Sequence, residues 1–165
     1  MKTNKIIVVL LTLLINISLD RISKLFAITL LRNKQPLFFL HNTMILTYAE
    51  NQGAFLSLGH DWNIIIKYSI LLIIPIIICF LAIWYCLSHK QSILRIIFII
   101  TIVSGGLSNL FDRLFNNFSV IDFINLGIGN IRTGILNVAD LSVTFGMVLF
   151  IIYELKNGRK SIYKN

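Results

Sequence analysis

The chain contains few of the residues on which many soluble enzyme sites depend. Its 165 residues include two cysteines, two prolines, three histidines and seven acidic side chains. Cys79 and Cys86 lie in one apolar stretch, where seven helical residues separate them by about 10 Å. A disulfide needs Cα atoms within roughly 7 Å, so we interpret both as small buried hydrophobic residues.

Metal-binding patterns are also missing from the sequence. His41, His60 and His89 are scattered over expected loops, with no His-Glu-x-x-His pattern and no cluster of cysteine and histidine. A metal centre would need several such ligands at short spacing. We therefore expect no metal and no other cofactor.

Charge is scarce and apolar residues are abundant. Charged residues make up 13% of the chain, hydrophobic residues make up 56%, and the mean hydropathy is +0.82. One small core cannot bury that much apolar surface, so the expected solvent is a lipid bilayer. The net charge of +8 does not indicate nucleic acid, because the basic residues flank apolar stretches and form no basic face with aromatic residues.

Four stretches have the length and hydropathy of membrane-spanning helices. They cover about residues 6–31, 62–87, 93–110 and 134–153. Pro75 predicts a kink in the second of them.

The distribution of lysine and arginine predicts the orientation of these spans. Eight basic residues flank the ends nearest the two termini and the loop around His89, and three flank the opposite ends. Cytoplasmic loops carry the excess of positive charge, so we expect both termini inside and the loops 32–61 and 115–133 outside. The basic start of the first span resembles a signal peptide, but Asp20 and Arg21 follow where a small-residue cleavage site would stand, so we expect this span to be retained.

The two outer loops contain β-favouring residues. Residues 37–49 surround a break at His41-Asn42, which predicts a short hairpin, and residues 119–126 resemble another strand. The predicted fold is an all-α membrane protein, a four-transmembrane-helix bundle with a small extracytoplasmic β-layer. No repeat, linker or low-complexity tract divides it, so we expect residues 1–165 to form a single integral membrane domain.

Two aspartates stand where a membrane protein tolerates them least. Asp122 lies in an apolar segment of the second outer loop, and Asp140 lies at the entrance of the fourth span, three residues after Asn137 and on the same helix face. A carboxylate near hydrocarbon is costly unless it has a partner or a function. Two of them converging at one end of a bundle suggest acid–base chemistry on water, here the hydrolysis of a peptide bond.

Other polar residues are expected at the same depth. Asp20 and Lys24 are four residues apart, in the favourable order for an ion pair that either only neutralises itself or orients a site. Asn51 offers a donor and an acceptor, and Gly53 permits a close backbone approach, although such a pair alone most often marks a turn.

The third span contains small residues and then polar ones. Gly105 and Gly106 would let a neighbouring helix approach closely. Asn109 and Arg113 share a face near the outer end, while Asp112 points elsewhere and is expected to bond to the outer loop. Four segments are thus expected to bring polar groups to the same depth near the outer face of the membrane. These groups would form either a buried structural network or a reaction site.

Three other functions are compatible with parts of this pattern. A proton-coupled transporter would spread its carboxylates through the membrane and often shows repeats, and a non-catalytic assembly protein would need no dyad. A serine–lysine peptidase would use Ser18 or Ser23 with Lys24. These serines lie within a helix, where adjacent residues do not face each other.

Five short motifs, in this order, resemble the lipoprotein signal peptidase (signal peptidase II) family of bacteria. They are Asp20-x-x-x-Lys24, Asn51-x-Gly53-Ala54-Phe55, Asn109-x-x-Asp112-Arg113, Val120-x-Asp122-Phe123 and Asn137-x-Ala139-Asp140. The resemblance implies a four-span aspartic endopeptidase with catalytic residues Asp122 and Asp140 and a structural role for Asp112. It implies that the residues supporting the site or binding substrate are Asp20, Lys24, Asn51, Gly53, Asn109, Arg113 and Asn137.

The resemblance also implies a substrate and a location. The substrate would be a prolipoprotein with diacylglycerol on a cysteine, cleaved just before that cysteine. The enzyme would lie in the bacterial cytoplasmic (inner) membrane, in contact with membrane lipid, as a monomer with its site toward the outer face.

Two features depart from the family pattern. Ser108 stands where the family usually has glycine, and its hydroxyl could bond to its own helix. The stretch from Asp112 to Asp122 is one residue longer than is usual in the family. Asn116-Asn117 stands where a glycine is expected in the turn. Asparagine tolerates the left-handed conformation, so we expect the turn to absorb the extra residue.

Overall fold

The structure is a computed structural model that describes residues 2–54 and 58–162. Its helices and strands, in chain order, are α1 (Lys2–Leu31), β1 (Leu37–Phe39), β2 (Met44–Asn51), α2 (Ile64–Tyr68), a π-helical turn (Ser69–Ile73), α3 (Ile74–Ser88), α4 (Ile93–Phe115), β3 (Val120–Ile128), β4 (Ile131–Leu136) and α5 (Val138–Ile162). Four of the helical segments are long and apolar enough to cross a membrane: Asn4–Leu31, Ile64–Ser88, Ile93–Phe115 and Val138–Asn157. The helical class and the four spans are thereby confirmed.

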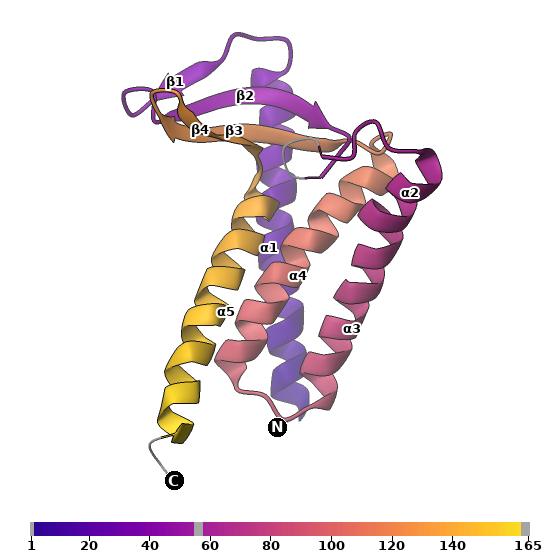
Figure 1. Ribbon diagram of the computed structural model, residues 1–165, viewed down its shortest axis with the longest axis vertical. Helices are drawn as coiled ribbons and strands as arrows, with labels where there is room; N and C mark the ends of the chain where they lie inside the picture. Colours follow the sequence, from indigo (N-terminus) through magenta and orange to yellow (C-terminus); the bar gives the residue numbers. More distant parts are fainter. Residues whose placement is uncertain (1, 55–57, 163–165) are drawn as a thin grey trace.

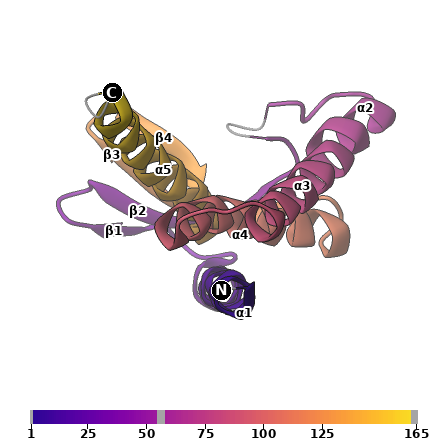
Figure 2. The same cartoon turned by 90° about the horizontal axis from the view of Figure 1, so that it is seen from below.

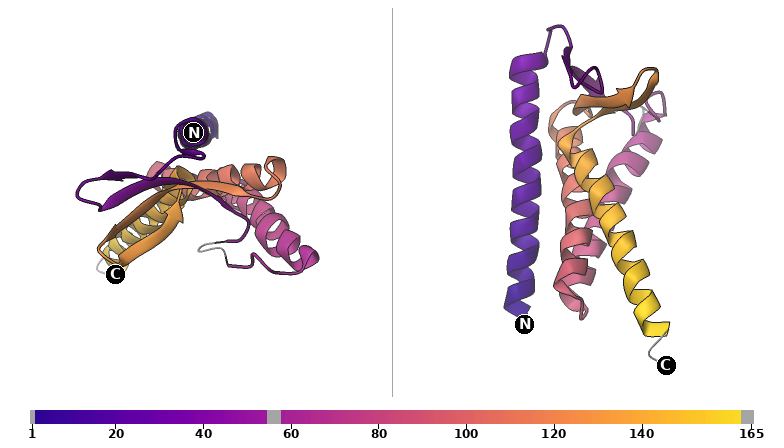
Figure 3. Two further views of the ribbon diagram at one scale, coloured as in Figure 1. Left: turned by 90° about the horizontal axis from the view of Figure 1, so that it is seen from above. Right: turned by 90° about the vertical axis from the view of Figure 1, so that its left-hand side faces the viewer.

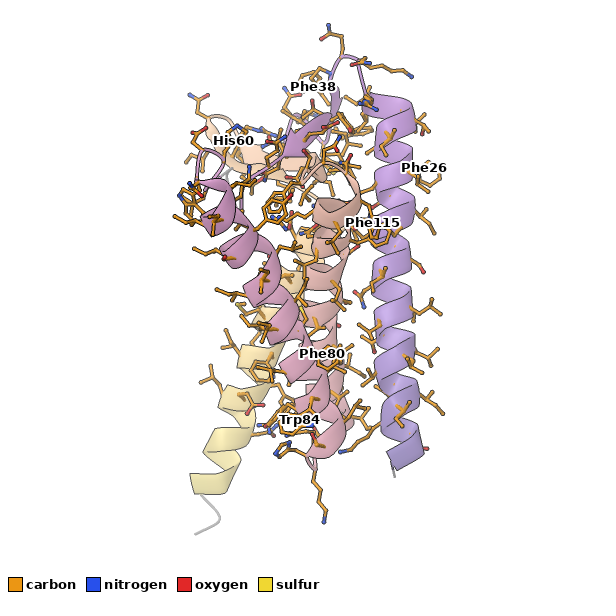
Figure 4. All side chains as sticks on the ribbon, turned by 90° about the vertical axis from the view of Figure 1, so that its right-hand side faces the viewer. Phe26, Phe38, His60, Phe80, Trp84 and Phe115 are labelled. Carbon is orange, nitrogen blue, oxygen red and sulfur yellow. The ribbon has the colours of Figure 1, made fainter. Side chains whose placement is uncertain are left out.

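Helix α4 lies at the centre of the bundle. It packs against α1, α3 and α5, and in the view from below α1 lies on one side while α3 and α5 diverge on the other (Figure 2). The core includes Cys86, Ile96 and Ile100, none of which has exposed surface, and Cys79 is buried as well. Many large apolar side chains instead face outward, and Phe26 projects away from α1 (Figure 4). That outward apolar surface is what a lipid environment requires.

The four strands form one antiparallel sheet in the order β1-β2-β3-β4. The sheet lies across the end of the bundle opposite both termini (Figure 1), and α1 rises beside it (Figure 3). The predicted hairpin around His41-Asn42 and the predicted strand near residues 119–126 are both confirmed. Pairing of Ala49 with Asp122 brings the end of β2 to the middle of the buried part of β3.

Two predicted span boundaries were wrong. Helix α4 continues to Phe115, beyond the predicted end at residue 110, because the polar residues of its last turns find partners inside the protein. The last span begins at Val138 and not at residue 134, because the preceding residues form β4. Gly129-Asn130 makes the two-residue turn into that strand, with Gly129 at φ 56°, which is a hairpin signal that the sequence analysis missed.

The second span is irregular near Pro75, as predicted. A π-helical turn, Ser69–Ile73, separates α2 from α3 directly before the proline. Proline has no backbone N–H and its ring crowds the preceding turn, so the regular hydrogen-bond ladder cannot pass through it.

Gly105 permits the closest contact between α4 and α5. A Cβ atom there would lie 2.4 Å from the carbonyl oxygen of Ala139 and 2.8 Å from Cγ2 of Val143. The predicted close helix approach is thus confirmed, and it occurs beside the first turn of α5. Gly106 faces α3, where a Cβ atom would make ordinary contact with Sγ of Cys79 at 3.4 Å.

Replacing Gly105 by alanine should lower the thermal stability of the purified protein, because overpacking a close helix contact costs about 1–3 kcal/mol. Gly106→Ala is the matched control, one position along the same helix. It should leave stability unchanged or raise it slightly, because alanine favours helices more than glycine does. Equal effects of the two changes would contradict the close contact.

Candidate active site

Asn137 and Asp140 fix the beginning of α5. The backbone N–H of Asp140 donates to Oδ1 of Asn137 at 2.9 Å, and the backbone N–H of Asn137 donates to Oδ2 of Asp140 at 3.1 Å. This reciprocal pattern is a capping box. Asp140 therefore lies in the first turn of α5, and not six residues past the start of the helix as the predicted span start at residue 134 implied.

Asp122 lies in the part of β3 that is buried on both faces. Its Oδ1 accepts a hydrogen bond from Nδ2 of Asn137 at 2.6 Å, and its Oδ2 accepts one from Nδ2 of Asn51 at 3.2 Å. Burial raises the pKa of Asp122 to about 6, and the negative charge of Asp140 contributes to the increase. The two amide hydrogen bonds oppose this increase because they stabilise the ionised form.

Asp122 and Asp140 line the same cavity, of about 70 Å³. The other residues that line it are Asn51, Ala54, Asn109, Arg113, Val120, Ile135 and Leu136. The cavity has room and polar partners for a water molecule. Two carboxyl groups beside such a space can activate water as a base and polarise a carbonyl group as an acid. Among the described residues, no three metal-ligating side chains converge.

Asn109 links Asp140 to Lys24. Its Nδ2 donates to Oδ1 of Asp140 at 2.8 Å, and its Oδ1 accepts from Nζ of Lys24 at 3.0 Å. An ammonium group can only donate, so Lys24 fixes which side of the amide faces the carboxylate. Arg113, on the same face as predicted, donates from Nη2 to the carbonyl oxygen of Gly53 at 2.9 Å.

Asn51 and Gly53 form the predicted turn after β2. The backbone N–H of Gly53 donates to Oδ1 of Asn51 at 2.9 Å, which leaves the amide nitrogen of Asn51 free to donate to Asp122 and to the carbonyl oxygen of Ala54. Phe55, which completes this motif in the sequence, lies outside the described residues.

A buried cluster of two acids and two bases lies behind this cavity. Nζ of Lys24 is 2.8 Å from Oδ2 of Asp20 and 2.8 Å from Oδ2 of Asp112, while Arg21 contacts Asp20 at 2.8 Å and Asp112 at 2.5 Å. The predicted ion pair on α1 is confirmed, and so is the bond from Asp112 to the outer loop, through the backbone N–H of Ile121 at 3.2 Å. Arg21 was missed, because helical spacing gives no reason for an adjacent residue to join the pair.

This charge cluster also holds the first turn of α5. Oδ1 of Asp20 accepts a hydrogen bond from the backbone N–H of Ala139 at 2.9 Å, next to Asp140. Ser108 donates from Oγ to Oδ2 of Asp20 at 2.6 Å. Ser108 therefore does not use the option of bonding to its own helix, because its hydroxyl lies beside a charged acceptor on α1.

The turn after α4 contains two residues with positive φ. Asn117 has φ 47°, as expected of asparagine at this turn, and Phe118 has φ 63°. The positive φ of Phe118 was not foreseen. Its ring packs against Tyr68 with 4.6 Å between centroids, so a hydrophobic contact accompanies the unusual backbone.

The model of the family described as signal peptidase (SPase) II matches residues 12–156. The chain belongs to the signal peptidase II family. One similar relative is the lipoprotein signal peptidase of Borrelia duttonii strain Ly, which is 32% identical over 163 residues; the match covers 96% of this chain and 95% of the relative. Another is the lipoprotein signal peptidase of Borrelia hermsii strain HS1 / DAH, which is 36% identical over 129 residues; that match covers 76% of this chain and 75% of the relative.

A solved structure described as a bacterial membrane enzyme, determined by the in meso method at 2.3 Å resolution, is similar to the whole fold. The TM-score is 0.74 at 25% identity, over 94% of this chain and 90% of the solved one. Like other signal peptidase II proteins, this chain is an aspartic peptidase of the bacterial inner membrane that removes signal peptides from prolipoproteins. The transporter, assembly-protein and serine–lysine alternatives are set aside.

Replacing Ser108 by alanine should destabilise the protein by about 1.5–3 kcal/mol, because it removes a buried hydrogen bond to a charged acceptor. Ser104→Ala is the matched control, since Ser104 is equally buried on α4 but bonds to the Thr101 carbonyl of its own helix. Thermal unfolding in detergent would measure both. The Ser108 account fails if the two variants unfold at the same temperature.

Proposed function

We propose that Asp122 and Asp140 are the catalytic dyad of this peptidase. The observation that carries the proposal is that both carboxyl groups line one water-sized cavity while separate donors hold each of them. Two carboxyl groups in one buried space cannot both ionise cheaply, so the pair holds one proton between them. That proton belongs to the dyad and is assigned to neither residue.

The mechanism follows from this shared proton. The ionised carboxylate takes a proton from water, and the oxygen of that water attacks the scissile carbonyl carbon. The protonated carboxyl group donates to the carbonyl oxygen as negative charge develops there. Arg113, which also lines the cavity, adds positive charge that favours the same transition state. When the tetrahedral intermediate collapses, a proton passes to the leaving amine, and no covalent enzyme intermediate forms.

The other predicted site residues divide into two groups. Asn51, Asn109 and Arg113 line the cavity, so we assign them contacts with the bound peptide, and Gly53 positions Arg113 through its carbonyl oxygen. Asp20, Lys24 and Asn137 are fully or almost fully buried and do not line the cavity. Their proposed role is to position Asp140 and Asp122.

The proposed orientation puts the sheet and the dyad on the extracytoplasmic side. Supporting this, the sheet lies at the end opposite both termini (Figure 1), and eight of the fifteen lysine and arginine residues flank the helix ends on the side of the termini, against three on the side of the sheet. A site at that depth can contact both the end of the substrate's apolar signal helix and its diacylglyceryl group in the outer leaflet. The acyl chains of that group would then lie between helices of the enzyme. The protein acts as a monomer and as one integral membrane domain.

Asp122→Asn and Asp140→Asn should each lower kcat/KM for a lipidated prolipoprotein by at least about a thousandfold, because each removes one partner of the proton transfer. The measurement is cleavage by purified protein in lipid, with circular dichroism and unfolding temperature to confirm folding. Asp61→Asn is the control, since the Asp61 side chain is 99% exposed and its ion pair, at 3.9 Å, is with the neighbouring His60.

A folded variant at either position that keeps full activity would remove that residue from the dyad. Loss of activity in Asp61→Asn as well would show that the assay reports charge or folding and not catalysis.

A further inference from the structure

Lys67 is a buried basic residue. It lies on α2, within the second membrane span, and is 8% exposed. Its Nζ donates to the carbonyl oxygen of His60 at 3.2 Å and lies 5.4 Å from the ring centroid of Phe118. Among residues 2–54 and 58–162, no carboxylate forms an ion pair with it. A buried ammonium group is costly unless an anion compensates its charge.

Lys67 shares a cavity of about 440 Å³ with Arg113. Gln52 and Asn117 add neutral polar groups, and none of the described residues that line this cavity is acidic. Nε of Arg113 is buried and has no hydrogen-bond partner in the part of the chain that the structure describes. Two cationic residues around one space of ligand size favour an anion with several acceptor oxygens.

The cavity also borders exposed apolar surface. Ile64, Leu114 and Phe115 line it and are 62%, 54% and 73% exposed. His60, whose carbonyl holds Lys67, lies at the end of the molecule that carries the sheet, above Phe115 (Figure 4). A ligand that satisfies both kinds of lining has an anionic head and an apolar tail.

We propose that this cavity binds the phosphate group of an anionic phospholipid, with the acyl chains along Ile64, Leu114 and Phe115. Lysine and arginine together suit phosphate oxygens, and the lack of a carboxylate in the lining leaves no partner for the ammonium of a zwitterionic headgroup. Arg113 lines both this cavity and the one that contains Asp122. Lipid bound here therefore contacts a residue of the peptidase site without being its substrate.

The test is binding of phosphatidylglycerol to the purified protein in neutral detergent, measured by native mass spectrometry. Phosphatidylcholine with the same acyl chains and inorganic phosphate are the comparison ligands. Wild type should bind phosphatidylglycerol at least about tenfold more tightly than either, and Lys67→Gln should weaken that binding by about tenfold, the effect of losing one charge-assisted hydrogen bond. Lys34→Gln, which removes the same charge from an exposed position after α1, should bind as wild type does.

Three results would overturn the proposal. Equal binding of the two phospholipids to wild type would show no anionic headgroup site, and this comparison needs no variant. Inorganic phosphate that binds as tightly as the lipid would assign the cavity to a soluble ion. Unchanged lipid binding by Lys67→Gln, with a higher KM for the prolipoprotein, would assign Lys67 to the peptide substrate.

Discussion

The architecture depends on the buried charge cluster formed by Asp20, Arg21, Lys24 and Asp112. Asp20, Lys24 and Asp112 are buried, while the Arg21 side chain is 26% exposed at the edge of the cluster. An unpaired buried charge would be very costly, so these groups must keep their partners, which constrains how α1 packs against α4. The same carboxylates also accept backbone N–H groups from the start of α5 and from β3. The cluster thus sets the positions of the two segments that carry the dyad.

Between this cluster and the dyad lies a layer of amide side chains. Lys24 orients Asn109, which donates to Asp140, and Asn137 donates both to Asn109 and to Asp122. Every one of these groups has a defined donor and acceptor side, so the layer can satisfy its hydrogen bonds in one arrangement. The rigid placement of two carboxyl groups beside a small cavity follows from that constraint.

The sequence was sufficient for the four spans, the hairpin and most of the polar residues, because hydropathy and helical spacing are local properties. It predicted the Asp20–Lys24 pair from a separation of four residues. It could not predict that Ser108 bonds to Asp20, since 88 residues separate them and only the packing of α4 on α1 brings them together. It also missed β4, although the Gly129-Asn130 turn was visible, because an apolar stretch of that length equally suits the start of a helix. No sequence pattern singled out Lys67, because its burial and its cavity depend on contacts with Phe118 and His60 that no spacing rule reveals.

The pH dependence of kcat/KM for a lipidated prolipoprotein tests most directly whether the two carboxyl groups work with one proton between them. Burial raises the pKa of Asp122 to about 6, so we expect the dyad, whose shared proton is assigned to neither residue, to lose that proton in a pH range around this value. The account predicts that kcat/KM then falls, approaching about tenfold per pH unit, and that Asn51→Ala moves the fall to higher pH by removing a donor to the ionised carboxylate. A profile that stays flat through this range, or a fall that Asn51→Ala leaves in place, would contradict it.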